Sequence, residues 1–407
     1  MPESDQQQPS GPPDYKVYRA RKGLFRGLRK PDLSSLRERG GGPPKLPRLG
    51  RDRDRGPRPE RPALRRAAKW LGFAALGWIL LSFLAFAVSA QLQAFKLSGD
   101  AKSALGGNPL LLVNPQTILV LGTDARPPGT EDGAAPSEEC FEQQSRGDAP
   151  HDECEVGQFR ADTLMLIRAG GGDFRKLSIP RDAYAEIPGQ SPQEINGAFA
   201  FGGAGAQTEA VEGFLGIEVD HVAIVDFTGF EDLIDAVGGV VVDVPQKICA
   251  DISGGAGGGQ GGWTLRLGKG DNTLDGEQAL TYARIRKPSP CPGPGPSAYS
   301  TGYDDFDRAK AQQDVISGIK GRLTDPLRLP YNFVKGPIIG WNAPKAFVSD
   351  MGFLTMPQLI LAAAIGGDSE ADVLCEGANA GCVPGPAGSI EVPESERRRA
   401  VKELLGE

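Results

Sequence analysis

The sequence predicts an α/β sandwich domain preceded by one membrane-spanning helix and a disordered basic tail. Residues 1–69 hold 19 Lys and Arg against 8 Asp and Glu, a net charge of +11, whereas residues 70–407 hold 26 against 44, a net charge of −18. Residues 70–95 separate these two parts and contain no charged residue. Beyond them, short apolar runs alternate with helical patterns. A single soluble domain does not need this layout.

The tail, residues 1–69, is rich in Pro and Gly and has almost no apolar periodicity. It buries too little apolar area to offset the entropy of ordering, so we expect disorder. Nucleic-acid binding is one alternative. However, the basic residues are not interleaved with aromatic ones, which favours a cytoplasmic flank attracted to anionic lipid. We therefore expect no nucleic-acid partner.

The uncharged run of 26 residues, 70–95, exceeds the ~20 residues that span a bilayer. A signal peptide is the competing interpretation, but the basic region before the run is too long and the run itself is longer than a usual signal core. Arg65, Arg66 and Lys69 flank its N-terminal side. The positive-inside rule then predicts a single-pass protein of the cell membrane, with residues 1–69 in the cytoplasm and the chain beyond the linker 96–113 outside.

All six cysteines follow the predicted span, in an oxidising compartment where disulfides persist. Six cysteines allow 15 pairings. Proximity along the chain favours Cys140–Cys154, Cys249–Cys291 and Cys375–Cys382. A thiolate metal site is the alternative, but the sequence has no CxxC pair and only two histidines, His151 and His221.

One domain is predicted over residues 114–365, because continuous apolar runs typical of buried strands alternate with helical patterns. The predicted strands are 117–122, 163–167, 176–179, 221–225 and 240–244, and the predicted helices are 206–215, 230–237, 276–286 and 306–323. Residues 254–262 and 288–296 are predicted loops. The C-terminal extension, 366–407, closes with a short charged helix over 394–405.

Charged residues gather at the ends of these elements, where ligands bind in open α/β sheets. They are Asp124 and Arg126, Arg160 and Asp162, Arg181 and Asp182, Arg284 and Arg286, and Asp305, Arg308 and Gln312. Carboxylates with several guanidinium groups suit a phosphorylated substrate and a divalent cation, Mg²⁺ or Mn²⁺, held by Asp124 and Asp162. For any one of these charges, a solvated loop position is the ordinary explanation. Their convergence on element ends favours a site.

These residues stand in segments that resemble the LytR-CpsA-Psr family of membrane-anchored cell-wall glycopolymer ligases. The matching segments are ILVLGTDAR at 118–126, RADTLMLIR at 160–168, LSIPRDAY at 177–184, INGAFAFGG at 195–203, VDHVAIVDFTGFEDLIDAVGGVVVDVP at 219–245, LDGEQALTYARIR at 274–286 and DDFDRAKAQQDVI at 304–316.

The resemblance implies a three-layer α-β-α domain with a central mixed sheet and a tunnel for a polyprenyl chain. It also implies transfer of a glycopolymer from undecaprenyl pyrophosphate to peptidoglycan through a phosphodiester. Asp124 and Asp162 fall on metal-associated carboxylates and, with Arg181, are the expected catalytic residues. The expected pyrophosphate-binding residues are Arg126, Arg160, Arg284, Arg286, Asp305, Arg308 and Gln312. The sequence does not say which aspartate is a base.

Phe199, Phe201, Phe214, Val222 and Ile224 are candidates for the tunnel lining or, equally, for ordinary core. Two insertions depart from the family pattern, one between Arg126 and Arg160 and one over 288–303. We expect them to form rims that shape access of the acceptor. Ala311 stands where the family often has another Arg, which weakens one phosphate contact or leaves it to Lys310. The alternative functions are a polyprenyl-pyrophosphate pyrophosphatase and a non-catalytic envelope regulator that binds lipid phosphate.

Overall fold

The computed structural model describes residues 61–97, 110–123, 138–148, 159–252, 263–286, 288–291, 293–297, 302–366, 372–376 and 380–407, together with residues 99, 102, 105, 107 and 154. Residues 62–407 form one compact unit. The tail predicted to be disordered lies outside the described residues over positions 1–60. The description below concerns the unit that begins with helix α1 (Arg61–Lys96).

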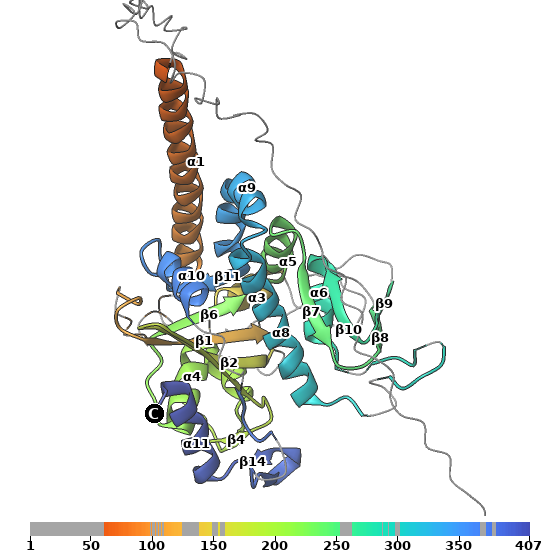
Figure 1. Ribbon diagram of the computed structural model, residues 1–407. Helices are drawn as coiled ribbons and strands as arrows, with labels where there is room; N and C mark the ends of the chain where they lie inside the picture. The colour runs from red at the N-terminus through yellow and green to blue at the C-terminus, as the bar shows by residue number, and fades with distance from the viewer. Residues whose placement is uncertain are drawn as a thin grey trace, which may run out of the picture. The chain divides into compact units, whose positions relative to one another are not determined.

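A six-stranded mixed sheet forms the centre of the domain (Figure 1). Its order is β11-β6-β1-β2-β3-β12. The central strand β1 runs parallel to β6 and antiparallel to β2. The strand bounds are β1 Gln116–Thr123, β2 Ala161–Gly170, β3 Asp173–Ile179, β6 His221–Val225, β11 Phe347–Ser349 and β12 Asp372–Val373. Four of these strands were predicted from apolar runs.

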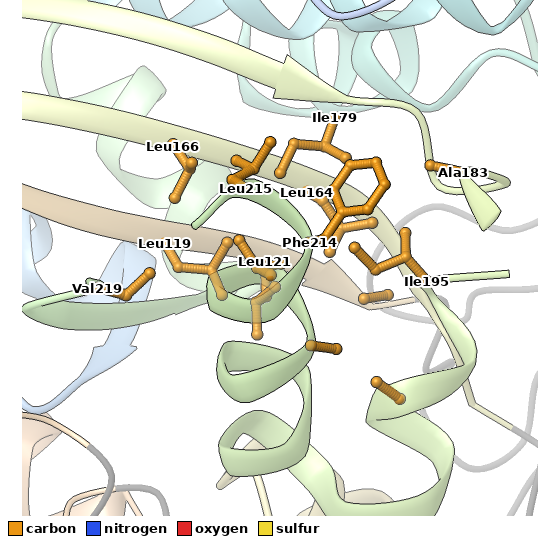
Figure 2. Close-up of a cluster of buried hydrophobic side chains, with 14 of the residues drawn as sticks. Leu119, Leu121, Leu164, Leu166, Ile179, Ala183, Ile195, Phe214, Leu215 and Val219 are labelled. Atoms are coloured by element: carbon orange, nitrogen blue, oxygen red, sulfur yellow. The ribbon is translucent and has the colours of Figure 1, made fainter. Parts of the chain in front are cut away.

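Both faces of the sheet are buried, which explains why its strands are apolar without alternation. Leu119 and Leu121 of β1 pack into a cluster with α4 (Gly197–Leu215) and α11 (Glu394–Leu405), part of which Figure 2 shows. Ile118 and Val120 point to the opposite face, where α10 (Thr355–Ile365) and the end of α1 cover them. The predicted three-layer α-β-α arrangement with a mixed sheet is confirmed.

A second hydrophobic cluster lies beside the sheet, between helices and two antiparallel strand pairs. Strand β7 (Val240–Val244) was predicted as a strand, and it pairs with β10 (Gly270–Leu274) rather than with the central sheet. Its residues alternate between buried and exposed, as expected for a strand covered on one face. The other elements here are β8 (Ile248–Ile252), β9 (Trp263–Leu267), α5 (Phe227–Ala236), α6 (Gly276–Arg284), α8 (Asp305–Thr324) and α9 (Leu329–Asn342).

The C-terminal extension is built into this fold. It adds β12 to the edge of the sheet and packs Ala400 and Leu404 of α11 into the core. It also carries the hairpin of β13 (Val383–Pro384) and β14 (Ile390–Glu391). The three predicted disulfides, Cys140–Cys154, Cys249–Cys291 and Cys375–Cys382, are all present. Smaller elements are α3 (Glu138–Ser145), β4 (Tyr184–Ala185) and β5 (Gln193–Glu194).

Helix α1 is long and apolar enough to cross a membrane. The candidate span is Arg65–Lys96, with a mean hydropathy of 2.3. Only 6% of its most apolar stretch is buried within the protein. A core helix of a soluble protein would be mostly buried, so the exposure of α1 supports a membrane anchor.

Candidate active site

The site forms where β2 begins and β3 ends. Because β2 and β3 are antiparallel and Leu164 pairs with Ile179, the residues just before Leu164 and just after Ile179 emerge at the same end of these two strands. Asp162 and Arg181 therefore meet. Helix α8 starts near this end of the strands, where Asp304 caps it by accepting hydrogen bonds from the backbone of Phe306 and Asp307.

Asp162 is held between two guanidinium groups. Arg181 Nη1 donates a hydrogen bond of 2.8 Å to Oδ1 of Asp162. Arg286 forms an ion pair with Oδ2 of the same carboxylate. Both partners are about a fifth exposed in the Arg181–Asp162 pair, so water screens it only in part. The two arginines come from elements more than 100 positions apart in sequence.

Further carboxylates surround Arg181 and Arg308. Nε of Arg181 lies 3.3 Å from an oxygen of Asp182 and 3.3 Å from an oxygen of Asp305. Nη1 of Arg308 lies 3.2 Å from the other oxygen of Asp305. Burial raises the pKa of Asp182, and the neighbouring Arg181 opposes this by lowering it. We call Asp162, Arg181, Arg286, Asp305 and Arg308 the arginine cluster.

Two donors of the arginine cluster are buried without a hydrogen bond. They are Nε of Arg181 and Nη1 of Arg308, which have no hydrogen-bond partner in the described part of the chain. The carboxylate oxygens near them are within ion-pair distance but not in hydrogen-bonding geometry. Arg308 is only 5% exposed. Burial lowers its pKa, and Asp305 opposes this by raising it.

These side chains line a narrow pocket of about 30 Å³. Asp162, Arg181, Asp305, Arg308 and Gln312 all contribute to its wall. The volume is about that of one water molecule. Unsatisfied cationic donors facing a small pocket are suited to phosphate oxygens, which accept charge-assisted hydrogen bonds from guanidinium groups.

Gln312 connects the elements that build the pocket. Its Nε2 donates to Oγ1 of Thr163 at 2.9 Å and to the carbonyl of Ala283 at 3.2 Å. It therefore joins α8 to the start of β2 and to the last turn of α6. Both hydrogen bonds are internal to the protein, so Gln312 positions the elements that form the pocket.

The two arginines at the C-terminal end of α6 diverge. The helix ends at Arg284, two residues earlier than predicted, and Ile285 leaves the helical conformation a few residues before Pro288. Arg286 reaches Asp162, whereas the guanidinium of Arg284 lies 4.4 Å from the centre of the Phe227 ring. Arg284 also faces Glu231, whose pKa burial raises to about 7 while Arg284 lowers it.

Three other predicted site residues stand apart from this geometry or outside the described residues. Arg160 forms an ion pair of 2.5 Å with Glu194. Asp124 and Arg126 lie outside the described residues. They follow Thr123 in the sequence, and β1 ends at Thr123 with a bulge, at the same end of the sheet's strands as Asp162. Their placement in the site stays a prediction.

The structure adds pocket residues from the C-terminal extension, which the sequence analysis left without a role. Val373 and Ile390 line the pocket. The backbone N–H of Ile390 donates to the carbonyl of Asp182 at 2.8 Å. Lys310 forms an ion pair of 2.5 Å with Glu376, which raises the pKa of Lys310 through their hydrogen bond. Lys310 is thus engaged by the extension, and Ala311 is buried.

The apolar candidates for a lipid tunnel belong to the hydrophobic core. Phe199, Phe214, Val222 and Ile224 are buried in the cluster between the sheet and α4, and Phe201 packs against it partly buried. Helix α4 is kinked at Gly202 and Gly203. Gly203 has φ of 62°, and a Cβ there would meet the carbonyl of Gly147 at 2.4 Å. Only glycine allows this approach of the disulfide-linked insertion to α4.

Comparisons with known proteins agree with the resemblance seen in the sequence. The chain is 33% identical over 171 residues to polyisoprenyl-teichoic acid–peptidoglycan teichoic acid transferase TagU of Enterococcus faecalis, covering 41% of this chain and 48% of that protein. It is 31% identical over 176 residues to the regulatory protein MsrR of Staphylococcus aureus, covering 43% and 47%. The chain spans about half the length of these curated relatives.

Among solved structures, TagV of B. subtilis is 23% identical, with a TM-score of 0.48, and the alignment covers 72% of this chain and 96% of that chain. A model of the LytR_cpsA_psr family matches residues 87–332, which is more than half of the chain. This chain therefore belongs to the LytR_cpsA_psr family.

Proposed function

We propose that this protein transfers a glycopolymer from an undecaprenyl-pyrophosphate carrier to peptidoglycan and forms a phosphodiester. The carrying observation is the pair of buried, unsatisfied donors on Arg181 and Arg308 beside Asp162 and Arg286. Among relatives, TagU is named as a transferase of teichoic acid from a polyisoprenyl carrier to peptidoglycan. Membership of the family supports the same class of reaction here.

The reaction is a displacement at phosphorus. The oxygen of an acceptor sugar hydroxyl attacks the phosphorus that bears the glycopolymer, and its proton passes to a carboxylate. The bond from that phosphorus to the bridging oxygen breaks, and polyprenyl phosphate leaves with the bridging oxygen. Guanidinium groups of Arg181, Arg286 and Arg308 would stabilise the charge that builds up on the phosphoryl oxygens. Asp124 or Asp162 would take the proton.

A divalent cation is part of the proposal. Carboxylate oxygens are the ligands that Mg²⁺ or Mn²⁺ prefers, and Asp162 lines the pocket, where its two oxygens pair with Arg181 and Arg286 and would be shared with the cation. Asp124 would supply the second carboxylate. No group of three or more metal-binding side chains occurs among the residues that the structure describes. When bound, the cation would add positive charge at the phosphates.

We also propose that α1 anchors the protein in the cell membrane with the N-terminus in the cytoplasm and the catalytic domain outside. Arg65, Arg66 and Lys69 support this orientation through the positive-inside rule. The three disulfides, all in the domain, support an oxidising location.

The test uses the full chain in detergent with a polyprenyl-pyrophosphate-linked saccharide, Mg²⁺ and peptidoglycan fragments. Asp162→Ala and Arg181→Ala should each reduce polyprenyl phosphate release by about 10²–10³-fold, as loss of a transition-state donor does. Arg168→Ala is the matched control, because Arg168 lies at the other end of β2, where it bonds Thr117. Near-normal release in both site variants would contradict the assignment. Release without saccharide on the acceptor would indicate a pyrophosphatase, and binding without release would indicate a regulator.

A further inference from the structure

Helix α9 presents a largely apolar surface to its surroundings. All of its exposed residues are apolar, namely Leu329, Pro330, Phe333, Val334, Ile338 and Trp341. Val334 is 65% exposed and Ile338 is 49% exposed. Positions 330, 334, 338 and 341 follow helical spacing, so they form one stripe. A surface helix of a soluble domain normally exposes its polar residues instead.

Two polar side chains of α9, those of Asn332 and Tyr331, turn toward the protein. Asn332 donates to the carbonyls of Arg322 and Leu323 at 3.0 and 3.2 Å, and Tyr331 donates to the carbonyl of Ala236 at 3.2 Å. This is the reverse of the arrangement expected in water. It suits a helix whose outer face meets hydrocarbon, where polar groups must be satisfied internally.

The same helix packs along α1. Trp78 Nε1 donates to the carbonyl of Phe333 at 2.7 Å, and Ser89 Oγ donates to the carbonyl of Trp341 at 2.7 Å. Between these contacts, Gly336 and Gly340 face Ser82. A Cβ on Gly336 would lie 2.6 Å from Oγ of Ser82, and one on Gly340 would lie 2.6 Å from its carbonyl oxygen. Gly-x-x-x-Gly spacing allows such close approach of helices within membranes.

The contact falls in the part of α1 that must lie in lipid if α1 spans the bilayer. The uncharged run is residues 70–95. Any stretch of about 20 residues within that run, the length that crosses the hydrocarbon layer, includes residues 76–89. Phe86 and Ala90 pack on the sheet, so the part of the run that can contact lipid lies before Phe86. Trp78 and Ser82 are therefore inside the hydrocarbon layer, and the part of α9 packed against them reaches it too.

A neighbouring helix and the local charge agree with a lipid surface. The exposed residues of α10 are Ile360, Leu361, Ala364 and Ile365, again all apolar. The segment 320–347, which contains α9, holds five basic residues and one acidic residue, although the chain after residue 69 carries a net charge of −18. Basic side chains at the rim of an apolar face bind anionic lipid headgroups.

We propose that α9 and α10 dock into the outer leaflet of an anionic phospholipid bilayer beside α1. The domain then contacts the membrane through α9 and α10 as well as through α1. The occupant of the apolar face is lipid. This inference rests on α1 as a span and not on the transferase reaction.

The test places a photo-crosslinking amino acid, p-benzoylphenylalanine, at single positions of the full chain in nanodiscs that contain phosphatidylglycerol. Val334→p-benzoylphenylalanine and Ile338→p-benzoylphenylalanine should give phospholipid adducts, detected by intact-mass spectrometry. Val383 is the matched negative control, since it is apolar and 51% exposed but belongs to the hairpin of β13 and β14. Leu80, on α1 and 58% exposed, is the positive control.

Lipid adducts at 334 and 338, at yields approaching that at 80 and well above that at 383, would support the docking surface. Adducts at 80 without adducts at 334 and 338 would overturn it while leaving the span intact. Crosslinked dimers at 334 or 338 would also overturn it, because a second copy of the chain would then cover the face.

Discussion

At the scale of single residues, the arginine cluster is a set of side chains whose types and positions at element ends are visible in the sequence. Their pairing is not visible, because it depends on how β2, β3, α6 and α8 meet. Arg284 and Arg286 illustrate the limit. They stand two positions apart, yet the end of α6 between them sends one to Phe227 and the other to Asp162. A difference of one backbone conformation, at Ile285, decides which arginine enters the cluster.

Asp314, also on α8, gives a prediction about stability. Burial raises its pKa from 3.8 to about 6, although Lys176 lowers it. The ionised carboxylate is thus less favourable in the folded protein than in the unfolded chain. Its contribution to stability is greatest below pH 4 and is lost as pH rises to about 6.

Asp314→Asn should remove this loss and raise the free energy of unfolding above pH 6 by about 1–2 kcal/mol, after allowance for partial exposure. Thermal or urea unfolding at pH 4 and pH 7 measures it. Asp325→Asn, at the C-terminal end of α8, is the control. Equal pH dependence in wild type and Asp314→Asn would show that Asp314 does not titrate in this way.

At the scale of elements, most of the central sheet was predictable because strands buried on both faces appear in the sequence as continuous apolar runs. The strands β11 and β12 were not predicted. They have three and two residues, too few for a periodic signal, and their place is fixed only by pairing with β6 and β3. Strand β7 has a clear pattern, but the pattern does not say which sheet it joins. Helix α9 was missed because Pro337 stands inside it and Gly336 and Gly340 are poor helix formers.

The C-terminal strap, residues 372–376 and 380–391, is the element whose role in the site the sequence did not indicate. It places Val373 and Ile390 in the pocket wall, and Cys375–Cys382 closes it into a loop. Because the strap bonds Asp182 and Lys310, we expect it to fix the position of the arginine cluster.

Cys375→Ser combined with Cys382→Ser should reduce polyprenyl phosphate release about tenfold or more, since small misplacements at a reacting centre are costly. The matched control, measured at saturating acceptor, is Cys249→Ser with Cys291→Ser. It removes the disulfide of β8 and should leave the rate within a few-fold of wild type, because the insertion that carries Cys291 is expected to affect only acceptor access. Melting temperatures separate misplacement from unfolding. Equal rates in both double variants would show that the strap does not fix the position of the arginine cluster.

The insertion before β2 carries the predicted rim. Its Gly147 carbonyl accepts a hydrogen bond of 3.1 Å from the backbone of Ala204 in α4, so the insertion is attached to the domain close to Gly203. Cys140→Ser with Cys154→Ser should raise KM for the acceptor several-fold and leave KM for the carrier near its original value. Acceptor-concentration series on both proteins measure this. If acceptor kinetics stay unchanged, the insertion is not an acceptor rim.

At the scale of the whole molecule, charge and hydropathy divide the chain into parts that should lie on different sides of a membrane. Protease added to intact cells should digest the domain and leave a fragment that contains the tail and α1. An antibody tag at the N-terminus, read by blotting, detects that fragment. Permeabilised cells, in which the basic tail is also cut, are the control. Loss of the N-terminal tag in intact cells would show the opposite orientation.

The ring of carboxylates around Arg181 also has a consequence for binding. Asp162, Asp182 and Asp305 already lie 2.8 to 3.3 Å from its guanidinium group, so much of the positive charge of Arg181 is balanced before any substrate arrives. Substrate binding is then an exchange of one anion for another rather than the filling of an empty positive site. A ligand wins this exchange only by bringing more charge than a carboxylate or additional contacts elsewhere. Pyrophosphate on a lipid carrier meets both conditions, whereas free inorganic phosphate meets only the first and should therefore bind more weakly.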